Sequence, residues 1–216
     1  MKKQIITGGI YLVIDPSMLL EKLLPKLEIV LKAGISVVQI WDNWGNMSNK
    51  SAVIQVICSL CHAYQVPVFI NNDWKLLQTM PLDGVHFDNI PAHYSMLRSQ
   101  LKQDCLIGIT CNNDLSVVKW ADDNKLDYVS FCSMFPSSTS NSCDIVTFET
   151  VRQARALTGI PLFLAGGITL DNLSELKALD FDGVALISGI MSANDSAQST
   201  KAYLQKLKKN EINNHK

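Results

Sequence analysis

Short runs of Val, Ile, Leu and Phe alternate along the chain with longer segments that have a helical period. Such alternation is typical of repeated βα units around a parallel sheet. Eight runs at a mean pitch of about 25 residues are predicted strands, and eight units can close into a barrel. The predicted strands are Ile10–Ile14, Val37–Ile40, Val68–Ile70, Gly84–Phe87, Leu106–Ile109, Tyr128–Phe131, Leu162–Ala165 and Val184–Ile187.

The segments between these runs have the pattern of amphipathic helices. In the first of them, charged residues face away from one apolar stripe, and Gly34 follows as a predicted helix stop. The stripe consists of Leu19, Leu20, Leu23, Leu24, Leu27, Val30 and Leu31.

The sequence therefore predicts an α/β fold, a single (β/α)8 TIM barrel, over residues 1–208, followed by a polar tail at 209–216. The segment from Lys206 onward shows no apolar period and is expected to lack order. A doubly wound sheet is the alternative, because it uses the same βα units. Its glycine-rich signature is missing after the first strand, where Ile14-Asp15-Pro16-Ser17 leads directly into a helix.

Composition narrows the classes of partner. The formal net charge is -1 and the pI is about 6.4, so the chain lacks the broad positive field that attracts nucleic acid or anionic membranes. No apolar run approaches the ~20 residues of a membrane span, and the start has no long apolar signal core. We expect a cytoplasmic protein whose six cysteines are reduced.

The ends of the last two predicted strands carry paired small residues. Gly166-Gly167 follows the seventh strand, and Ile187-Ser188-Gly189 ends the eighth. Either pair alone is explained by a tight turn. Because the carboxyl ends of barrel strands converge on one face, the two together predict a phosphate site built from backbone N–H groups.

An ordered series of motifs resembles the thiamine phosphate synthase family, including its thiazole tautomerase-like branch. The series is Tyr11-Leu12-Val13-Ile14-Asp15, Val38-Gln39-Ile40, Ile70-Asn71-Asn72, Asp83-Gly84-Val85-His86, Gly108-Ile109-Thr110, Asp127-Tyr128-Val129, Phe135-Pro136-Ser137-Ser138-Thr139, Gly166-Gly167-Ile168-Thr169 and Asp182-Gly183-Val184-Ala185. The resemblance implies that hydroxymethylpyrimidine diphosphate condenses with thiazole phosphate to give thiamine phosphate and pyrophosphate. It also implies that Mg²⁺ assists.

The resemblance also assigns roles to residues of this chain. Gln39 and Asn71 match polar positions that contact the pyrimidine or its diphosphate, and hydroxyl positions contact thiazole and phosphate. The catalytic set it implies is Gln39, Asn71, Thr110, Ser137 and Thr139. The phosphate-binding set is Gly166, Gly167, Ile187 and Ser188.

Several charged positions depart from the family pattern. Trp41 and Asn43 stand where an arginine and a lysine would grip diphosphate, and Ser140 replaces a further lysine. Asn72 stands at the position of the family's first magnesium-binding carboxylate, and Asp73 is the next residue. Asp88 or Asn89 stands where the second carboxylate is expected, and the candidate metal ligands are Asn72, Asp73 and Asp88.

These departures leave three functions open. The first is the magnesium-dependent synthase, and the second is a non-coupling relative that binds thiazole or thiamine phosphate or isomerises a similar ligand. The third is another phosphate-binding barrel enzyme. The histidine of the tautomerase branch is Ser133 here, beside Cys132, and His86 has either a structural role or a place in the pocket. Small phosphate and diphosphate substrates are the expected partners. The sequence leaves the oligomeric state open, and a homodimer is one alternative.

Overall fold

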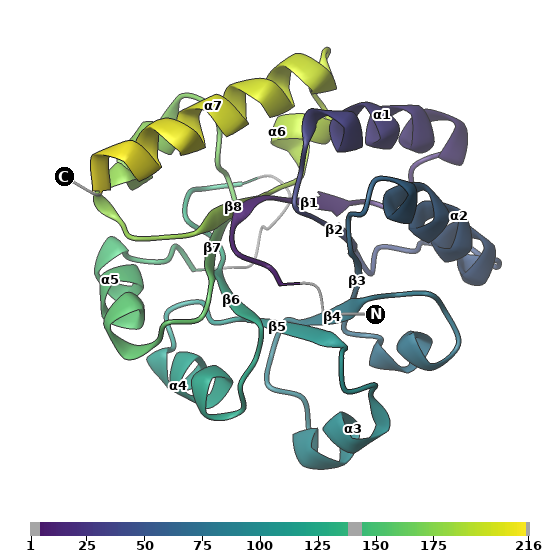
Figure 1. The fold of residues 1–216 in the computed structure, drawn as a ribbon, viewed down its shortest axis with the longest axis horizontal. Coiled ribbons are helices and arrows are strands. Elements are labelled where there is room, and N and C mark those ends of the chain that lie inside the picture. The colour runs from purple at the N-terminus through teal and green to yellow at the C-terminus, as the bar shows by residue number, and fades with distance from the viewer. Residues whose placement is uncertain (1–4, 138–143, 215–216) are drawn as a thin grey trace.

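Parallel strands close into a barrel in the computed structural model, which describes residues 5–137 and 144–214, with side chains described as far as residue 208. Each strand pairs with its neighbours in chain order, and β1 pairs with β8 to close the ring (Figure 1). The strands are β1 Gly9–Ile14, β2 Val37–Ile40, β3 Val68–Asn71, β4 Gly84–Phe87, β5 Leu106–Thr110, β6 Tyr128–Phe131, β7 Leu162–Ala165 and β8 Gly183–Leu186.

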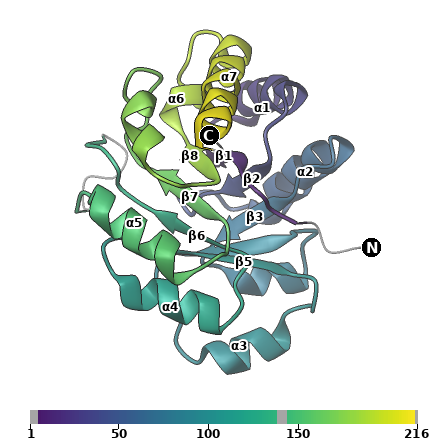
Figure 2. The same cartoon turned by 60° about the vertical axis from the view of Figure 1, so that its left-hand side comes forward.

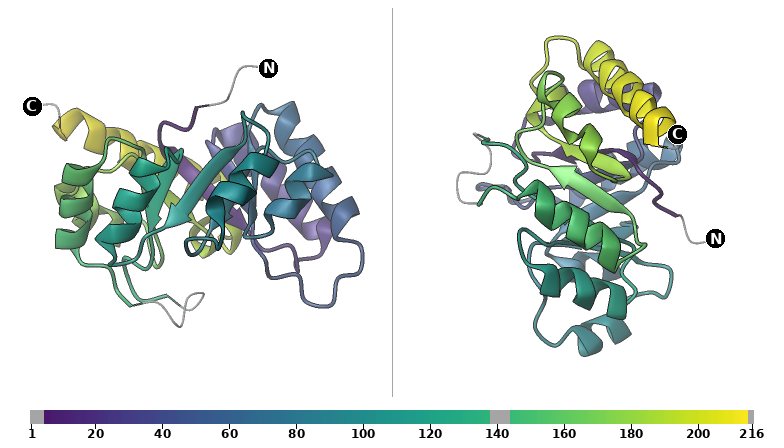
Figure 3. Two further views of the ribbon diagram at one scale, coloured as in Figure 1. Left: turned by 90° about the horizontal axis from the view of Figure 1, so that it is seen from below. Right: turned by 90° about the vertical axis from the view of Figure 1, so that its left-hand side faces the viewer.

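Helices surround the ring, and the N-terminal segment leaves at one end of the barrel (Figures 1 and 3). The α-helices are α1 Leu20–Ala33, α2 Lys50–Ala63, α3 Tyr94–Gln100, α4 Leu115–Asp123, α5 Phe148–Leu157, α6 Ser188–Met191 and α7 Ser196–Asn214. Two connections hold short 3-10 helices instead, η1 Trp74–Gln78 and η2 Asn172–Ala178. In Figure 2, α7 lies beside α1.

The predicted TIM barrel is confirmed, and every predicted strand agrees with the structure to within one residue at either end. A doubly wound sheet is excluded, because β1 and β8 pair with each other. Gly34 caps α1 in the left-handed conformation at φ 97°, and its N–H donates to the Leu31 carbonyl at 3.0 Å. The backbone beyond Lys206 is helical as far as Asn214, so the expected loss of order there is wrong.

Aromatic side chains fill the barrel interior. Tyr11, Phe69, Tyr128 and Phe163 form a cluster of buried rings. Glycines on neighbouring strands make room for them: a Cβ added at Gly108 would lie 2.0 Å from the Tyr128 ring. The interior is therefore solid below the carboxyl ends of the strands, as in other barrels of this kind.

Three aspartates repeat one contact at the amino ends of the strands. Asp83, Asp127 and Asp182 each precede an even-numbered strand. Each carboxylate accepts a hydrogen bond at 2.8 Å from the backbone N–H at or next to the start of the preceding strand, from Val68, Ile107 and Leu162. These contacts fix the spacing of the strands at the end of the barrel opposite the carboxyl ends.

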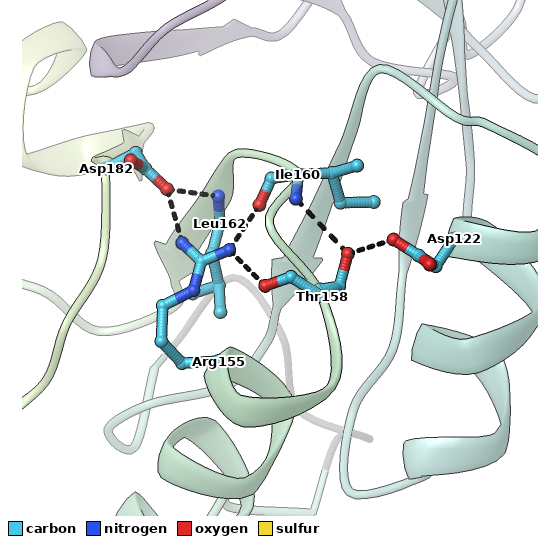
Figure 4. A network of polar contacts seen from close by, with 6 residues as sticks. All are labelled: Asp122, Arg155, Thr158, Ile160, Leu162 and Asp182. Atoms are coloured by element: carbon cyan, nitrogen blue, oxygen red, sulfur yellow. Dashed lines mark hydrogen bonds and ion pairs between the residues drawn. The ribbon is translucent and has the colours of Figure 1, made fainter.

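Asp182 belongs to a larger network (Figure 4). Its carboxylate also accepts from Arg155 Nη1 at 2.9 Å, and Arg155 Nη2 donates to the Thr158 and Ile160 carbonyls at 2.6 and 2.7 Å. Thr158 donates in turn to Asp122 at 2.5 Å. The network ties α5 and α4 to the starts of β7 and β8.

Candidate functional site

A cavity of about 700 Å³ opens at the carboxyl ends of the strands and takes side chains from all eight of them. Most of the predicted site residues line this one cavity. They are Gln39, Asn71, Asp88, Thr110, Ser137, Gly166, Gly167, Ile187 and Ser188.

The turn after β7 has consecutive left-handed glycines. Gly166 has φ 85° and Gly167 has φ 64°. A Cβ at Gly166 would lie 2.0 Å from Ser133 Oγ, and one at Gly167 would lie 2.5 Å from the Phe135 carbonyl oxygen. Both positions therefore require glycine, and successive N–H groups in such a turn form a concavity that suits an anion.

Unbonded amides follow β8 as well. Within the described residues, the N–H groups of Gly167, Ser188 and Gly189 donate no hydrogen bond. The next amides of the chain are occupied, because Ile190 and Met191 donate to the Ile187 carbonyl at 3.2 and 2.8 Å. We call Gly166, Gly167, Ser188 and Gly189 the glycine cup.

Two contacts brace the glycine cup from behind. Asn172 Nδ2 donates to the Gly167 carbonyl at 2.9 Å, and Tyr203 Oη donates to the Ile168 carbonyl at 3.2 Å. Because these bonds hold carbonyl oxygens on the protein side, the N–H groups of the turn remain available to the cavity.

Amide and carboxylate groups line another wall of the cavity. Gln39 Nε2 donates to Asn71 Oδ1 at 3.0 Å, and Asn71 Nδ2 donates to Asp88 Oδ1 at 3.1 Å. Asn72 Nδ2 donates to Asp88 Oδ2 at 2.7 Å, and Asn72 Oδ1 accepts from the Asp88 N–H at 3.0 Å. Gln39 and Asn71 are buried, so these bonds set their orientation.

A second series of hydrogen-bonded polar side chains lies across the bottom of the cavity, which we call the barrel floor. Tyr11 donates to Gln39 Oε1 at 2.7 Å, and the Tyr11 and Tyr128 hydroxyl oxygens lie 2.8 Å apart. The imidazole of His86 lies between Tyr128 Oη, at 2.7 Å from Nδ1, and Thr110 Oγ1, at 2.8 Å from Nε2. Thr110 Oγ1 is 3.1 Å from Ser130 Oγ.

Burial makes these groups neutral. Desolvation lowers the pKa of His86 to about 4, against the opposing effect of the Asp88 charge. Desolvation also raises the pKa of the Tyr11 and Tyr128 phenols well above the ordinary value. At neutral pH the barrel floor therefore carries hydroxyls and an uncharged imidazole.

The cavity has little positive charge. Its described lining includes no lysine or arginine, and the sequence of residues 138–143 includes none. Trp41 contributes to the wall, and Asn43 donates to Asp15 at 2.9 Å. An anion in this cavity depends on backbone N–H groups and on any cation that enters with it.

The candidate metal ligands do not come together as a set. Asp88 is the single carboxylate in the described lining of the cavity, Asp73 does not line it, and the Asn72 amide is used by Asp88. The described residues contain no group of three acidic, histidine or cysteine side chains arranged to hold a metal. Mg²⁺ is often held by one or two carboxylates together with substrate phosphates, and Asp88 fits that smaller role.

The sequence did not reveal every polar residue that lines the cavity. Thr139, which it did suggest, lies outside the described residues. The two tyrosines and Ser130 were missed, although Tyr11 and Tyr128 stand within quoted motifs. The available signal was a polar side chain in a strand predicted to be buried. His86 does face the cavity, and its ring also makes two buried hydrogen bonds.

A sequence model of the thiamine monophosphate synthase family matches residues 10–190 of this chain. The chain belongs to this family. Among similar proteins, the thiamine-phosphate synthase of Xylella fastidiosa is 31% identical over 195 residues, which cover 90% of this chain and 82% of that protein. The thiamine-phosphate synthase of Nitrosococcus oceani is 29% identical over 198 residues, 91% of each chain.

A solved family structure supports the fold. The thiamine phosphate pyrophosphorylase from Pyrococcus furiosus superimposes with a TM-score of 0.80 at 20% identity, over 94% of this chain and 97% of that one. In the part of the chain that the structure describes, no helix is both long and apolar enough to cross a membrane.

Proposed function

We propose that the chain is a thiamine phosphate synthase, a transferase that couples hydroxymethylpyrimidine diphosphate to thiazole phosphate. One observation carries the proposal: in a member of this family, the glycine cup and the Gln39–Asn71 amide pair line the same cavity. The cup suits a phosphate monoester, and the amides suit a polar heterocycle.

The residues of the chain would divide the work as follows. The unbonded N–H groups of Gly167, Ser188 and Gly189 bind the thiazole phosphate. Gln39 and Asn71 orient the pyrimidine so that its methylene carbon faces the thiazole nitrogen. The carbon–oxygen bond to diphosphate breaks, pyrophosphate leaves, and the thiazole nitrogen supplies the electron pair of the new carbon–nitrogen bond.

The hydroxyl groups at the rim would complete the contacts. Thr110 and Ser137 line the cavity and would contact the departing diphosphate or the thiazole, and Thr139 is proposed for the same role. Mg²⁺, held by Asp88 and by diphosphate oxygens, would supply the charge neutralisation that the missing lysine and arginine cannot.

A coupled assay tests this function. Folded protein, both substrates and Mg²⁺ are expected to give thiamine phosphate and pyrophosphate in equal amounts. Gln39→Ala should lower kcat/KM by about a hundredfold, since it removes a buried positioning amide. The matched control is Gln153→Ala, which removes an exposed amide on α5 and should leave the rate unchanged. The absence of product from folded wild-type protein would refute the proposal.

The cation-poor cavity favours a second candidate, a relative that binds thiazole or thiamine phosphate, or isomerises a similar ligand, without coupling. Calorimetric titration separates the two candidates. The synthase predicts Mg²⁺-dependent binding of the pyrimidine diphosphate as well as binding of thiazole phosphate. Binding of thiazole phosphate alone favours the second candidate.

We propose cytoplasmic work on small phosphorylated substrates, with no nucleic acid or membrane partner, which suits a biosynthetic enzyme of net charge -1. A homodimer is the proposed assembly. Light scattering on the purified chain measures its mass directly against the 24.0 kDa of one copy.

A further inference from the structure

The Asp88 carboxylate fixes the direction of the amide bonds along the cavity wall. Asn71 Nδ2 donates to Asp88 Oδ1 at 3.1 Å, which leaves Asn71 Oδ1 to accept from Gln39 Nε2 at 3.0 Å. Gln39 then donates through Nε2, and its Oε1 accepts from Tyr11. A flip of either amide would place a carbonyl oxygen against another acceptor.

The same reasoning continues through the tyrosines. The single hydroxyl proton of Tyr11 goes to Gln39, so the 2.8 Å contact with Tyr128 requires Tyr128 to donate to Tyr11. Tyr128 then has no proton left for His86, which lies 2.7 Å away. The proton in that contact must belong to His86 Nδ1.

The proton on Nδ1 also determines the hydrogen bond at Nε2, on the other side of the imidazole. In a neutral ring with Nδ1–H, Nε2 is an acceptor, so Thr110 donates to it at 2.8 Å. Thr110 can then accept from Ser130 at 3.1 Å. Both ring partners of His86 are hydroxyl groups and the residue is buried, which favours the neutral form.

Packing restricts Tyr128, so its hydroxyl group cannot easily change hydrogen-bond partners. The Tyr128 ring stacks on the His86 ring at 5.7 Å between centroids and 18° between planes. Gly108 has no side chain where a Cβ would meet the Tyr128 ring, so the ring fills that space completely. The hydroxyl therefore stays between its two partners.

We propose that Tyr11, Tyr128 and His86 are positioning residues, joined in a one-way hydrogen-bond relay that holds the Gln39 carboxamide in the orientation set by Asn71 and Asp88. Every donor in this relay points from Ser130 toward Asp88. Its catalytic value rests on the proposed function, whereas the relay itself is a property of the folded chain.

The relay leaves Gln39 with a defined pair of groups for a ligand. After bonding Tyr11 and Asn71, the carboxamide keeps one N–H and one lone pair. A donor beside an acceptor is complementary to the edge of an aminopyrimidine, where an amino group lies next to a ring nitrogen. Rotation of the carboxamide would exchange the two and lose the match.

Nitrogen NMR of the folded protein at pH 7 tests the relay without any substrate. The His86 signals, assigned by their loss in His86→Gln, should show a protonated Nδ1 and an unprotonated Nε2. A wild-type ring protonated at Nε2 would overturn the proposal.

A distant substitution gives a sharper test. Tyr11 makes no hydrogen bond to His86, yet in Tyr11→Phe the Tyr128 proton has lost its acceptor and should turn to His86 Nδ1. The His86 proton is then expected to move to Nε2 and donate to Thr110. Tyr64→Phe is the control, since it removes a hydroxyl bonded to Glu28 outside the barrel and should leave the tautomer unchanged. An unchanged tautomer in folded Tyr11→Phe would refute the coupling.

Binding measurements test the positioning role. Tyr11→Phe is expected to weaken the binding of hydroxymethylpyrimidine diphosphate about tenfold and to leave thiazole phosphate binding unaltered. Equal loss for both ligands, or no loss for either, would contradict that role. If wild-type protein shows the predicted tautomers but makes no thiamine phosphate, the synthase proposal fails and the relay stands. If wild-type protein makes thiamine phosphate but the His86 tautomer is unchanged in Tyr11→Phe, the relay fails and the synthase proposal stands.

Discussion

Asn72, which the family resemblance matches to a carboxylate, holds a left-handed backbone conformation with φ 55°. Its amide donates to Asp88 Oδ2 at 2.7 Å and its carbonyl accepts from the Asp88 N–H. A neutral amide thus satisfies Asp88 where a second carboxylate would repel it. At the scale of the residue, these two bonds tie the turn after β3 to the end of β4.

The substitution Asn72→Asp should restore a carboxylate pair and with it a dependence on Mg²⁺. Repulsion between the carboxylates is expected to cost about 1 kcal/mol in the absence of metal, which lowers Tm by ~2–4 °C. Millimolar Mg²⁺ should raise the Tm of the variant clearly more than that of wild type. Thermal unfolding with and without Mg²⁺ measures this, and an equal response of both proteins would contradict it.

Single residues were predictable where a motif marked them. Gly167 and Ser188 were placed at the cavity from their positions after strands, and Gln39 and Asn71 from the family motifs. Tyr11 was not, because barrel strands are buried on both faces and their sequence does not show which residues point inward. Asp73 was misleading for a related reason: it follows the strand closely, but the chain turns into η1 and carries it away from the cavity.

At the scale of the element, Asp182 links β8, β7 and α5 through Arg155, whose side chain is 18% exposed. Asp182→Ala removes the carboxylate that pairs with this cation and accepts from the Leu162 N–H. We expect a loss of about 2–3 kcal/mol in the free energy of unfolding. Urea unfolding measures the loss, with Asp180→Ala as the control at an exposed aspartate nearby. Equal values for the two variants would show that the network contributes nothing.

Strands were easier to predict than the connections between them. Runs of Val, Ile and Leu mark buried strands directly, and each was found within one residue of its bounds. The connections before β4 and β8 were expected to be helical, but η1 and η2 form only short 3-10 helices there. Their helical form depends on how much chain is needed to cover the barrel, which local sequence does not encode.

At the scale of the whole molecule, α7 packs on α1 and β1, outside the closed ring of strands. Tyr203 and Leu207 are its buried side chains near the end of the described part, and Tyr203 also braces the glycine cup. A chain ending at residue 208 should therefore melt within about 2 °C of the full chain. A chain ending at residue 195 should lose its cooperative transition. Circular dichroism on both truncations tests the proposed domain boundary, and cooperative melting of the shorter one would contradict it.

The pattern of apolar and polar residues alone could not show whether the sheet closes into a barrel. Alternating βα units fit an open doubly wound sheet as well as a barrel, and the missing glycine signature and the family motifs separated them. The contact that settles the matter joins Gly9 to Gly183 and Leu12 to Leu186, across almost the full length of the chain. Pairing of such distant segments leaves no local mark in the sequence.

The proposed phosphate site consists of backbone amides after β7 and β8 that hold one phosphate ester. Titration of ¹⁵N-labelled protein with thiazole phosphate reports on each of these amides separately. We expect saturable shifts of the Gly167, Ser188 and Gly189 amides. Gly167→Ala should weaken the binding about tenfold, and the control Gly159→Ala, in open space, should not alter it. The phosphate site is refuted if thiazole phosphate binds and leaves these amides unmoved, or if folded Gly167→Ala binds it as tightly as wild type does.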